Sequence, residues 1–176
     1  MFAPFILRSR RRGITPSDIL ADLALWFRGD NGLKTGGARQ FTSANTEYFS
    51  IADDAVFDLG TGDFLLNVFV YLDTSGVQHT ISSKYEDENN YWKLEVTSGD
   101  KLHFIAVASG STVVEVTGTT SLSTGQYYGV ALAVDRNATA NTKFYVDGVA
   151  EVSGTPTVGA TSLDNSGSFY LGVDLI

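Results

Sequence analysis

Short apolar runs separated by turn residues fill most of this chain of 176 residues. In residues 91–96 the apolar Trp92, Leu94 and Val96 alternate with more polar residues, which is the period of a strand with one buried face. Residues 64–72 are almost continuously apolar, which predicts a strand covered on both faces. The period of a β-strand, not that of a helix, therefore organises the chain.

Turn residues divide the remaining sequence into further strands. Asp147-Gly148 lies between two short strand-like runs and predicts a two-residue type I′ hairpin. The turns at residues 98–100 and 109–110 join three successive strands into a meander. Besides the two strands above, we expect strands at 23–28, at the end of 41–51, and at 79–84, 101–108, 112–117, 127–135, 143–146, 149–152 and 168–173.

The first residues differ from the rest because they lack a sustained period. We interpret residues 1–13 as an extended basic and apolar arm, and residues 14–176 as one sandwich domain. Thr15 followed by Pro16 predicts the start of one short helix, with Thr15 as its N-cap. That helix should end near residues 21–23.

Composition agrees with an all-β globular domain, since 43% of the residues are hydrophobic and 18 are glycine. Four of the 12 basic residues lie in the arm, which has no Asp or Glu, so residues 14–176 hold 8 basic against 20 acidic residues. This acidic body repels phosphate, and only the arm could contact a nucleic acid. The absence of cysteine excludes disulfides and thiolate metal sites.

The apolar start of the chain is too short to cross a bilayer, because residues 1–7 are followed at once by arginines. In a secretory signal the positive charge comes before the apolar run, and here it comes after it. We therefore expect neither a signal peptide nor a membrane anchor.

Six segments in order resemble the laminin-G/concanavalin-A-like lectin/glucanase superfamily, including domains found in bacteriophage virion proteins. Together they span about residues 15–173. The resemblance implies a two-sheet antiparallel β-sandwich of the jelly-roll type. The segments read ITPSDILADLALWFRGDNG, FTSANTEYFSIAD, DFLLNVFVYLD, HTISSKYEDENNYWKLEVTSGDKLHF, LSTGQYYGVALAVD and TKFYVDGVAEVSGT.

The chain departs from this family at its end. Members usually carry a closing strand after the segment that reads YLG here, beside the start of the chain, whereas this sequence stops at residues 173–176. The resemblance then implies either a shortened sandwich or a gap filled by a partner chain. An unpaired sheet edge is an association site unless it is covered.

Catalytic patterns are missing from the sequence. Glycoside hydrolysis needs two carboxylates across a cleft, and the hydrolase relatives carry Glu-x-Asp-x-x-Glu, which does not occur here. Glu95 stands alone on its strand, and Glu115 has only apolar and threonine neighbours. We interpret His79 and His103 as partly exposed strand histidines. The protein is therefore not expected to be an enzyme.

An acidic loop gives one candidate metal site. Glu86, Asp87 and Glu88 provide carboxylates at a density that can hold Ca²⁺, and many relatives bind Ca²⁺ on a loop rim. The alternative is a solvated hairpin turn. Residues 53–54 with Asp58 form a second, weaker candidate. No other cofactor is indicated.

Tyrosines provide candidate glycan contacts, because aromatic rings can stack on sugars. Tyr85, Tyr91 and Tyr145 are the candidates, and the alternative is that they pack in the core or between strands. Tyr91 and Trp92 point to opposite faces, so only one of them can be a core residue.

The arm is the sharpest charged feature, and its apolar residues favour protein docking over pure phosphate binding. The alternative is a disordered terminus that only makes the chain more soluble. Our first functional hypothesis is a structural virion protein, decorating a capsid or associated with a tail, with other virion subunits and copies of itself as partners. The alternative is a lectin-like carbohydrate-binding module, located outside the cell or on its surface. The arm residues proposed to bind a partner are Phe2, Phe5, Ile6, Leu7, Arg8, Arg10, Arg11 and Arg12.

Overall fold

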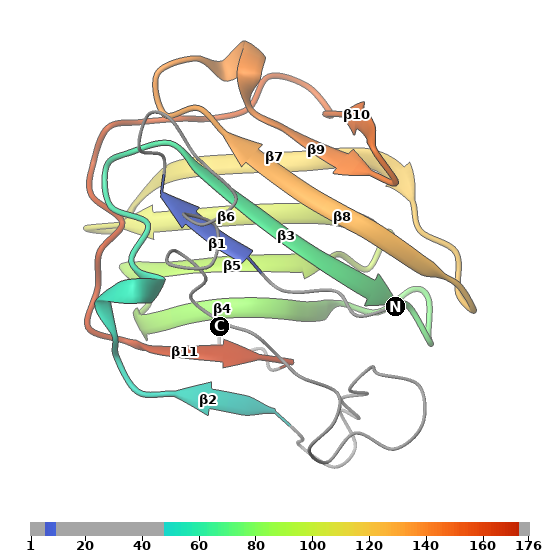
Figure 1. Ribbon diagram of the computed structural model, residues 1–176, viewed down its shortest axis with the longest axis horizontal. Coiled ribbons are helices and arrows are strands. Elements are labelled where there is room, and N and C mark those ends of the chain that lie inside the picture. Colours follow the sequence, from blue (N-terminus) through green and yellow to red (C-terminus); the bar gives the residue numbers. More distant parts are fainter. Residues whose placement is uncertain (1–5, 10–47, 173–176) are drawn as a thin grey trace, which may run out of the picture.

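A computed structural model describes residues 6–9 and 48–172, which form two antiparallel β-sheets packed face to face (Figure 1). One sheet has the strand order β1-β3-β8-β9-β10, and the other has the order β2-β11-β4-β5-β6-β7. The strands are β1 (Ile6–Ser9), β2 (Phe49–Ile51), β3 (Phe64–Tyr71), β4 (His79–Asp87), β5 (Asn90–Val96), β6 (Lys101–Ala108), β7 (Ser111–Ser121), β8 (Tyr127–Val134), β9 (Lys143–Val146), β10 (Val149–Glu151) and β11 (Ser168–Leu171), with 3₁₀ turns η2 (Ala55–Phe57) and η3 (Thr139–Asn141). The predicted antiparallel sandwich is confirmed.

The core lies between the sheets and is built from the alternating apolar positions of each strand. Trp92, on β5, is completely buried, and Phe104 beside it on β6 is in ring contact with it at 6.2 Å between centroids. From the opposite sheet, Phe64 approaches Phe104 at 5.7 Å. Burial of such large rings supplies much of the hydrophobic stabilisation of a sandwich. Tyr91, on the other face of β5, is only partly buried, as the alternation predicts.

The hairpins follow the predicted turn chemistry. Asp147 and Gly148 have φ angles of 49° and 84°, so both central residues are in the left-handed region that a type I′ turn requires. Val146 pairs with Val149, which confirms a two-residue loop. Strands β4 to β7 follow one another as neighbours in the sheet, and the predicted meander is therefore confirmed.

One prediction about burial is wrong. Strand β3 is not covered on both faces, because Phe69 is 55% exposed and Leu65 and Tyr71 are also exposed. The inner face of β3 packs on the core, while these three side chains of its outer face remain exposed, although Tyr71 contacts Tyr127 at 4.9 Å between ring centroids. An unbroken apolar run identifies a strand without showing how many of its faces are covered.

Backbone pairing places part of the predicted arm in a sheet. Strand β1 pairs antiparallel with β3, with Ile6 opposite Asn67 and Ser9 opposite Phe64. A pairing of this kind satisfies backbone groups along the edge of β3. The other predicted elements of residues 1–47, including the short helix, the strand at 23–28 and the arm residues Phe2, Phe5, Arg10, Arg11 and Arg12, lie outside the described residues. Residues 173–176, where the family's closing strand would follow, lie outside them too.

Buried polar residues hold the loops at the ends of the sheets. Arg136, after β8, is buried and donates hydrogen bonds to the carbonyls of Gly159 (2.6 Å), Gly60 (3.1 Å) and Thr161 (2.5 Å). Burial lowers the pKa of Arg136, although Asp63 acts in the opposite direction. In the described ranges 6–9 and 48–172, no helix is long and apolar enough to cross a membrane.

Candidate functional site

Tyrosines gather on the outer face of the six-stranded sheet, opposite the core. Tyr85 on β4 lies directly across from Tyr91 on β5, and their ring centroids are 6.2 Å apart. Tyr170 on β11 contacts Tyr48, just before β2, at 6.0 Å between centroids. These pairs lie on neighbouring strands, because Ser168 is opposite Tyr85 and Tyr170 follows two residues later on the same face. We call Tyr48, Tyr170, Tyr85 and Tyr91 the tyrosine row.

The tyrosine row is partly accessible from solvent. Half of Tyr48 is exposed, and the other three side chains are partly buried. Burial is the main cause that raises the pKa of the Tyr91 hydroxyl, which therefore stays protonated and can donate a hydrogen bond. The alternation of β4, β5 and β11 produces this surface, since the inward neighbours Trp92 and Phe169 are both core residues.

Next to the tyrosine row lie four ionisable side chains, Lys93, Glu95, His103 and Glu115, which we call the charged cluster. Lys93 and Glu95 follow Tyr91 at every second position of β5, and their side chains pair at 2.9 Å. Nδ1 of His103, on β6, lies 2.8 Å from Oε1 of Glu95. Nε2 of the same ring lies 3.3 Å from Oε1 of Glu115, on β7.

The charges of the cluster depend on one another. The hydrogen bond with Glu95 raises the pKa of His103 against the opposing effect of burial, and Glu115 adds to the rise. Burial would raise the pKa of Glu95, but hydrogen bonds from His103 and Lys93 outweigh it and lower that pKa. Because an imidazole donates from both nitrogens only when it is protonated, contacts to two carboxylates suit the imidazolium form.

Sequence reasoning missed this cluster. His103 is a partly exposed strand histidine, as predicted, but Glu95 does not stand alone, because the meander places the two residues opposite each other. The signal was the tight turn at residues 97–101, which fixes the register of β5 against β6. His79 fits its prediction better, with Nε2 at 2.8 Å from the carbonyl oxygen of Thr74.

One buried hydroxyl forms part of the floor between the tyrosine row and the cluster. Ser83 on β4 lies between Tyr170 on β11 and Lys93 on β5 in the strand register. The residue is 1% exposed, and its Oγ has no hydrogen-bond partner among the described residues. A buried hydroxyl without a partner is costly, so a group that could bond to it would be favoured there.

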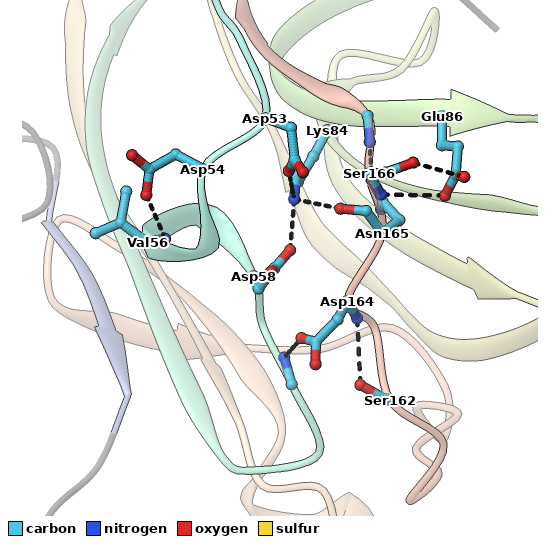
Figure 2. A network of polar contacts seen from close by, with 12 residues as sticks. Asp53, Asp54, Val56, Asp58, Lys84, Glu86, Ser162, Asp164, Asn165 and Ser166 are labelled. Atoms are coloured by element: carbon cyan, nitrogen blue, oxygen red, sulfur yellow. Dashed lines mark hydrogen bonds and ion pairs between the residues drawn. The ribbon is translucent and has the colours of Figure 1, made fainter.

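The acidic residues around η2, between β2 and β3, pair with a buried lysine. Lys84 has a fully buried side chain, and its Nζ lies 2.8 Å from Oδ1 of Asp53 and also pairs with Asp58 (Figure 2). It also donates to the carbonyl oxygen of Asn165 at 2.5 Å. Burial acts to lower the pKa of Lys84, but the hydrogen bonds and charges of Asp53 and Asp58 outweigh it and raise that pKa. The ammonium therefore neutralises the weaker of the two predicted calcium candidates.

The stronger calcium candidate is also dispersed. Glu86 accepts hydrogen bonds from the amide and hydroxyl of Ser166, which Figure 2 shows on the neighbouring loop. Asp87 accepts from the amide of Asn89 at 2.8 Å and from Asn90, while Glu88 is exposed at the turn. In the part of the chain that the structure describes, no three acidic or histidine side chains converge as a metal site.

The three predicted glycan tyrosines do not form one group. Tyr85 and Tyr91 are neighbours, but Tyr145 lies on β9 in the other sheet, opposite Ala131 and Ala150. Tyr48 and Tyr170 were not predicted, because their place beside Tyr85 depends on how β2 and β11 join the sheet from distant parts of the chain.

Comparisons with known proteins give one family and several distant structural likenesses, two of which follow. No curated protein sequence matches the chain. A structure of botulinum neurotoxin type C, whose cell entry is described as dependent upon interaction with two ganglioside molecules, is 12% identical with a TM-score of 0.45. The match covers 74% of this chain and 38% of the neurotoxin chain. The carbohydrate-binding module CBM66 from Bacillus subtilis is 14% identical with a TM-score of 0.37 and covers 63% of this chain and 74% of its own.

The family match, unlike these two distant structural likenesses, identifies the superfamily of the chain. Residues 43–175 match the family described as the concanavalin A-like lectin/glucanases superfamily. This range contains ten of the strands in the described residues, β2 to β11, and both the tyrosine row and the charged cluster. The fold and the sequence match agree, and the chain belongs to the concanavalin A-like lectin/glucanases superfamily.

Proposed function

We propose that this domain is a non-catalytic carbohydrate-binding module that holds a glycan on the outer face of its six-stranded sheet. The observation that carries the proposal is the tyrosine row lying directly beside the charged cluster. Sites for small polar ligands combine apolar or aromatic surface with a few polar groups that fix orientation. A sugar has both apolar C–H faces and hydroxyls, and this surface offers partners to both.

The geometry suits an extended sugar chain better than a single sugar. The tyrosine row crosses four strands, β2, β11, β4 and β5, and adjacent strands are about 4.8 Å apart. The row is thus on the order of 15 Å long, which exceeds the width of one sugar ring. Tyrosine hydroxyls at the row and the carboxylate of Glu115 beside it can hydrogen-bond successive sugar units.

Catalysis is not supported by the chemistry of the cluster. Hydrolysis of a glycosidic bond needs a carboxyl group with a raised pKa to protonate the leaving oxygen. The pKa of Glu95 is lowered, and its two oxygens contact His103 and Lys93. Glu95 therefore stays ionised at neutral pH and is unsuited to donate a proton. We expect a bound glycan to be released intact.

The virion hypothesis remains a prediction. It depends on the arm at residues 1–13, of which the structure describes only the backbone of β1. The virion partners and any contact between the arm and nucleic acid remain predictions on the same ground. The location, which is the virion or, for a lectin-like module, outside the cell or on its surface, also remains a prediction. The carbohydrate-binding proposal depends instead on side chains that the structure describes.

A glycan array followed by calorimetry tests the proposal. Wild-type protein should bind at least one glycan class, and Tyr91→Ala and Tyr170→Ala should each weaken that binding about tenfold, since loss of one stacking ring costs on the order of 1–2 kcal/mol. Tyr145→Ala, on the other sheet, is the matched control and should bind like the wild type. A blank array, or loss of binding in Tyr145→Ala alone, would contradict the proposed face. Incubation of a bound oligosaccharide should release no new reducing ends.

A further inference from the structure

The charge that a bound glycan meets beside the tyrosine row is the carboxylate of Glu115. Its side chain is 48% exposed, whereas those of Lys93, Glu95 and His103 are 9%, 7% and 15% exposed. The backbone of Glu115 is fixed by two hydrogen bonds with Thr157, at 3.0 and 2.9 Å, so the edge of β7 holds this residue in place. The exposed member of the charged cluster is therefore negative.

The positive groups of the cluster are turned toward Glu95. Lys93 pairs with one oxygen of Glu95 at 2.9 Å, and Nδ1 of His103 lies 2.8 Å from the other. The contact between His103 and Glu115 is longer, at 3.3 Å, so the imidazole is held more closely by the buried carboxylate. An anionic sugar would have to displace a buried ion pair to reach either cation, which is costly.

The next cation along β6, Lys101, lies farther from the tyrosines than the charged cluster does. By the alternation of β6, Lys101 is on the same face as His103. It lies two residues before His103, at the end of the strand away from Val107, which pairs with Tyr91. In the register, Glu115 is in line with Ile105 and Lys93, one position beyond the line that holds Tyr85 and Tyr91. One such step along a strand face is about 7 Å, and β7 also lies two strands, about 10 Å, from β5, which carries Tyr91. A sugar chain that stacks on Tyr91 and extends across β6 thus brings its next units to Glu115.

We infer that the glycan bound on this face carries free amino groups, so that the ammonium of a hexosamine unit pairs with Glu115 while neighbouring rings stack on the tyrosine row. This inference rests on the proposed function and narrows its ligand to cationic amino sugars. Neutral sugars should bind more weakly, and sugars with carboxylate or sulfate groups should not be ligands. An ion pair at a half-exposed site contributes up to about 1 kcal/mol, which corresponds to about a fivefold preference.

Matched oligosaccharides test the inference. Calorimetry should compare a β-1,4-linked glucosamine oligomer with its fully N-acetylated counterpart of equal length and with an oligogalacturonate, at a mildly acidic pH where the amines are protonated. The wild type should bind the amine form about fivefold more tightly than the acetylated form, and the oligogalacturonate most weakly. Sodium chloride should reduce the amine preference, because exposed charges are screened by salt.

Two variants with the same change in charge provide the control. Glu115→Gln should bind both glucosamine forms equally, whereas Glu88→Gln, at the exposed turn between β4 and β5, should keep the wild-type preference. An equal loss in both variants would mean that the overall acidity of the domain attracts the amine, and would overturn the inference. Preference for oligogalacturonate would overturn it too. Failure to bind any glycan would overturn the proposed function itself, whereas binding without an amine preference would overturn only the inference.

Discussion

Nδ1 of His103 lies 2.8 Å from Oε1 of Glu95, and this hydrogen bond joins strands β5 and β6 beneath the outer face of the six-stranded sheet. It raises the pKa of the histidine and lowers that of the glutamate. The two residues therefore make the stability of the domain depend on pH in opposite directions, and each dependence can be measured separately.

Stability should fall as the pH rises through the folded-state pKa of His103. The pKa of His103 is raised above its usual value of 6.5 by Glu95 and Glu115. The folded state thus binds the proton more tightly, and the stabilisation is complete below the unfolded pKa and is lost above the folded one. Urea unfolding from pH 5 to 9 should show the free-energy difference between wild type and His103→Gln shrinking with pH. A difference that is constant across this range would contradict the prediction.

Glu95 should be much more important to stability than Glu115. Glu95→Gln removes the carboxylate from a buried pair with Lys93 and from His103, and breaking a buried ion pair costs about 3–5 kcal/mol. Glu115→Gln affects a half-exposed group and should cost at most about 1 kcal/mol. Because the pKa of Glu95 is lowered, its contribution is present above the unfolded value near 4.5 and is lost as pH falls through the folded value. Chemical denaturation of both variants at neutral and acidic pH measures this difference. Equal losses of unfolding free energy in the two variants would refute the prediction that Glu95 is the more important residue.

Local sequence patterns predict the strands of this domain well, since alternation and turns act over a few residues. Asp147-Gly148 shows this best, because the need for two left-handed residues fixes both the turn and the register of β9 against β10. The site was less predictable. Tyr85 and Tyr91 come from one hairpin and could be paired, but Tyr170 shares their face only through the pairing of β11 with β4, in which Ser168 is opposite Tyr85, 83 positions away. No short-range pattern encodes that pairing.

The same reasoning explains why the acidic residues near β3 misled the prediction. Asp53 and Asp58 look like a cation site in the sequence, and they do bind a cation, but it is the ammonium of Lys84, which lies 31 and 26 residues away. On β4 the lysine occupies an inward position opposite Trp92, where alternation predicts an apolar residue. A charge at a core position was therefore the available signal for a buried partner.

Loss of the Lys84 ammonium should destabilise the domain strongly. Lys84→Met leaves Asp53 and Asp58 facing each other without their shared cation, and we expect a cost of about 3–5 kcal/mol. The triple variant with Asp53→Asn and Asp58→Asn should regain part of this loss, since it removes the uncompensated charges. Urea unfolding of the single and triple variants checks both values. If the triple variant were less stable than Lys84→Met, charge repulsion could not be the cause of the loss.

Arg136 should be needed for its shape as well as its charge. Its guanidinium donates to three loop carbonyls, on Gly60, Gly159 and Thr161, and hydrogen bonds to a charged group contribute about 1.5–3 kcal/mol each at most. Arg136→Lys keeps the charge, but one ammonium cannot reproduce the fork that reaches all three acceptors. We therefore expect Arg136→Lys to lower the free energy of unfolding by about 2–3 kcal/mol, with Lys143→Arg as a control that changes it little. Hydrogen exchange should show faster exchange at the amide of Leu163, which bonds to Gly60 in the same loop contact. Wild-type protection in Arg136→Lys would show that the loops are held by other contacts.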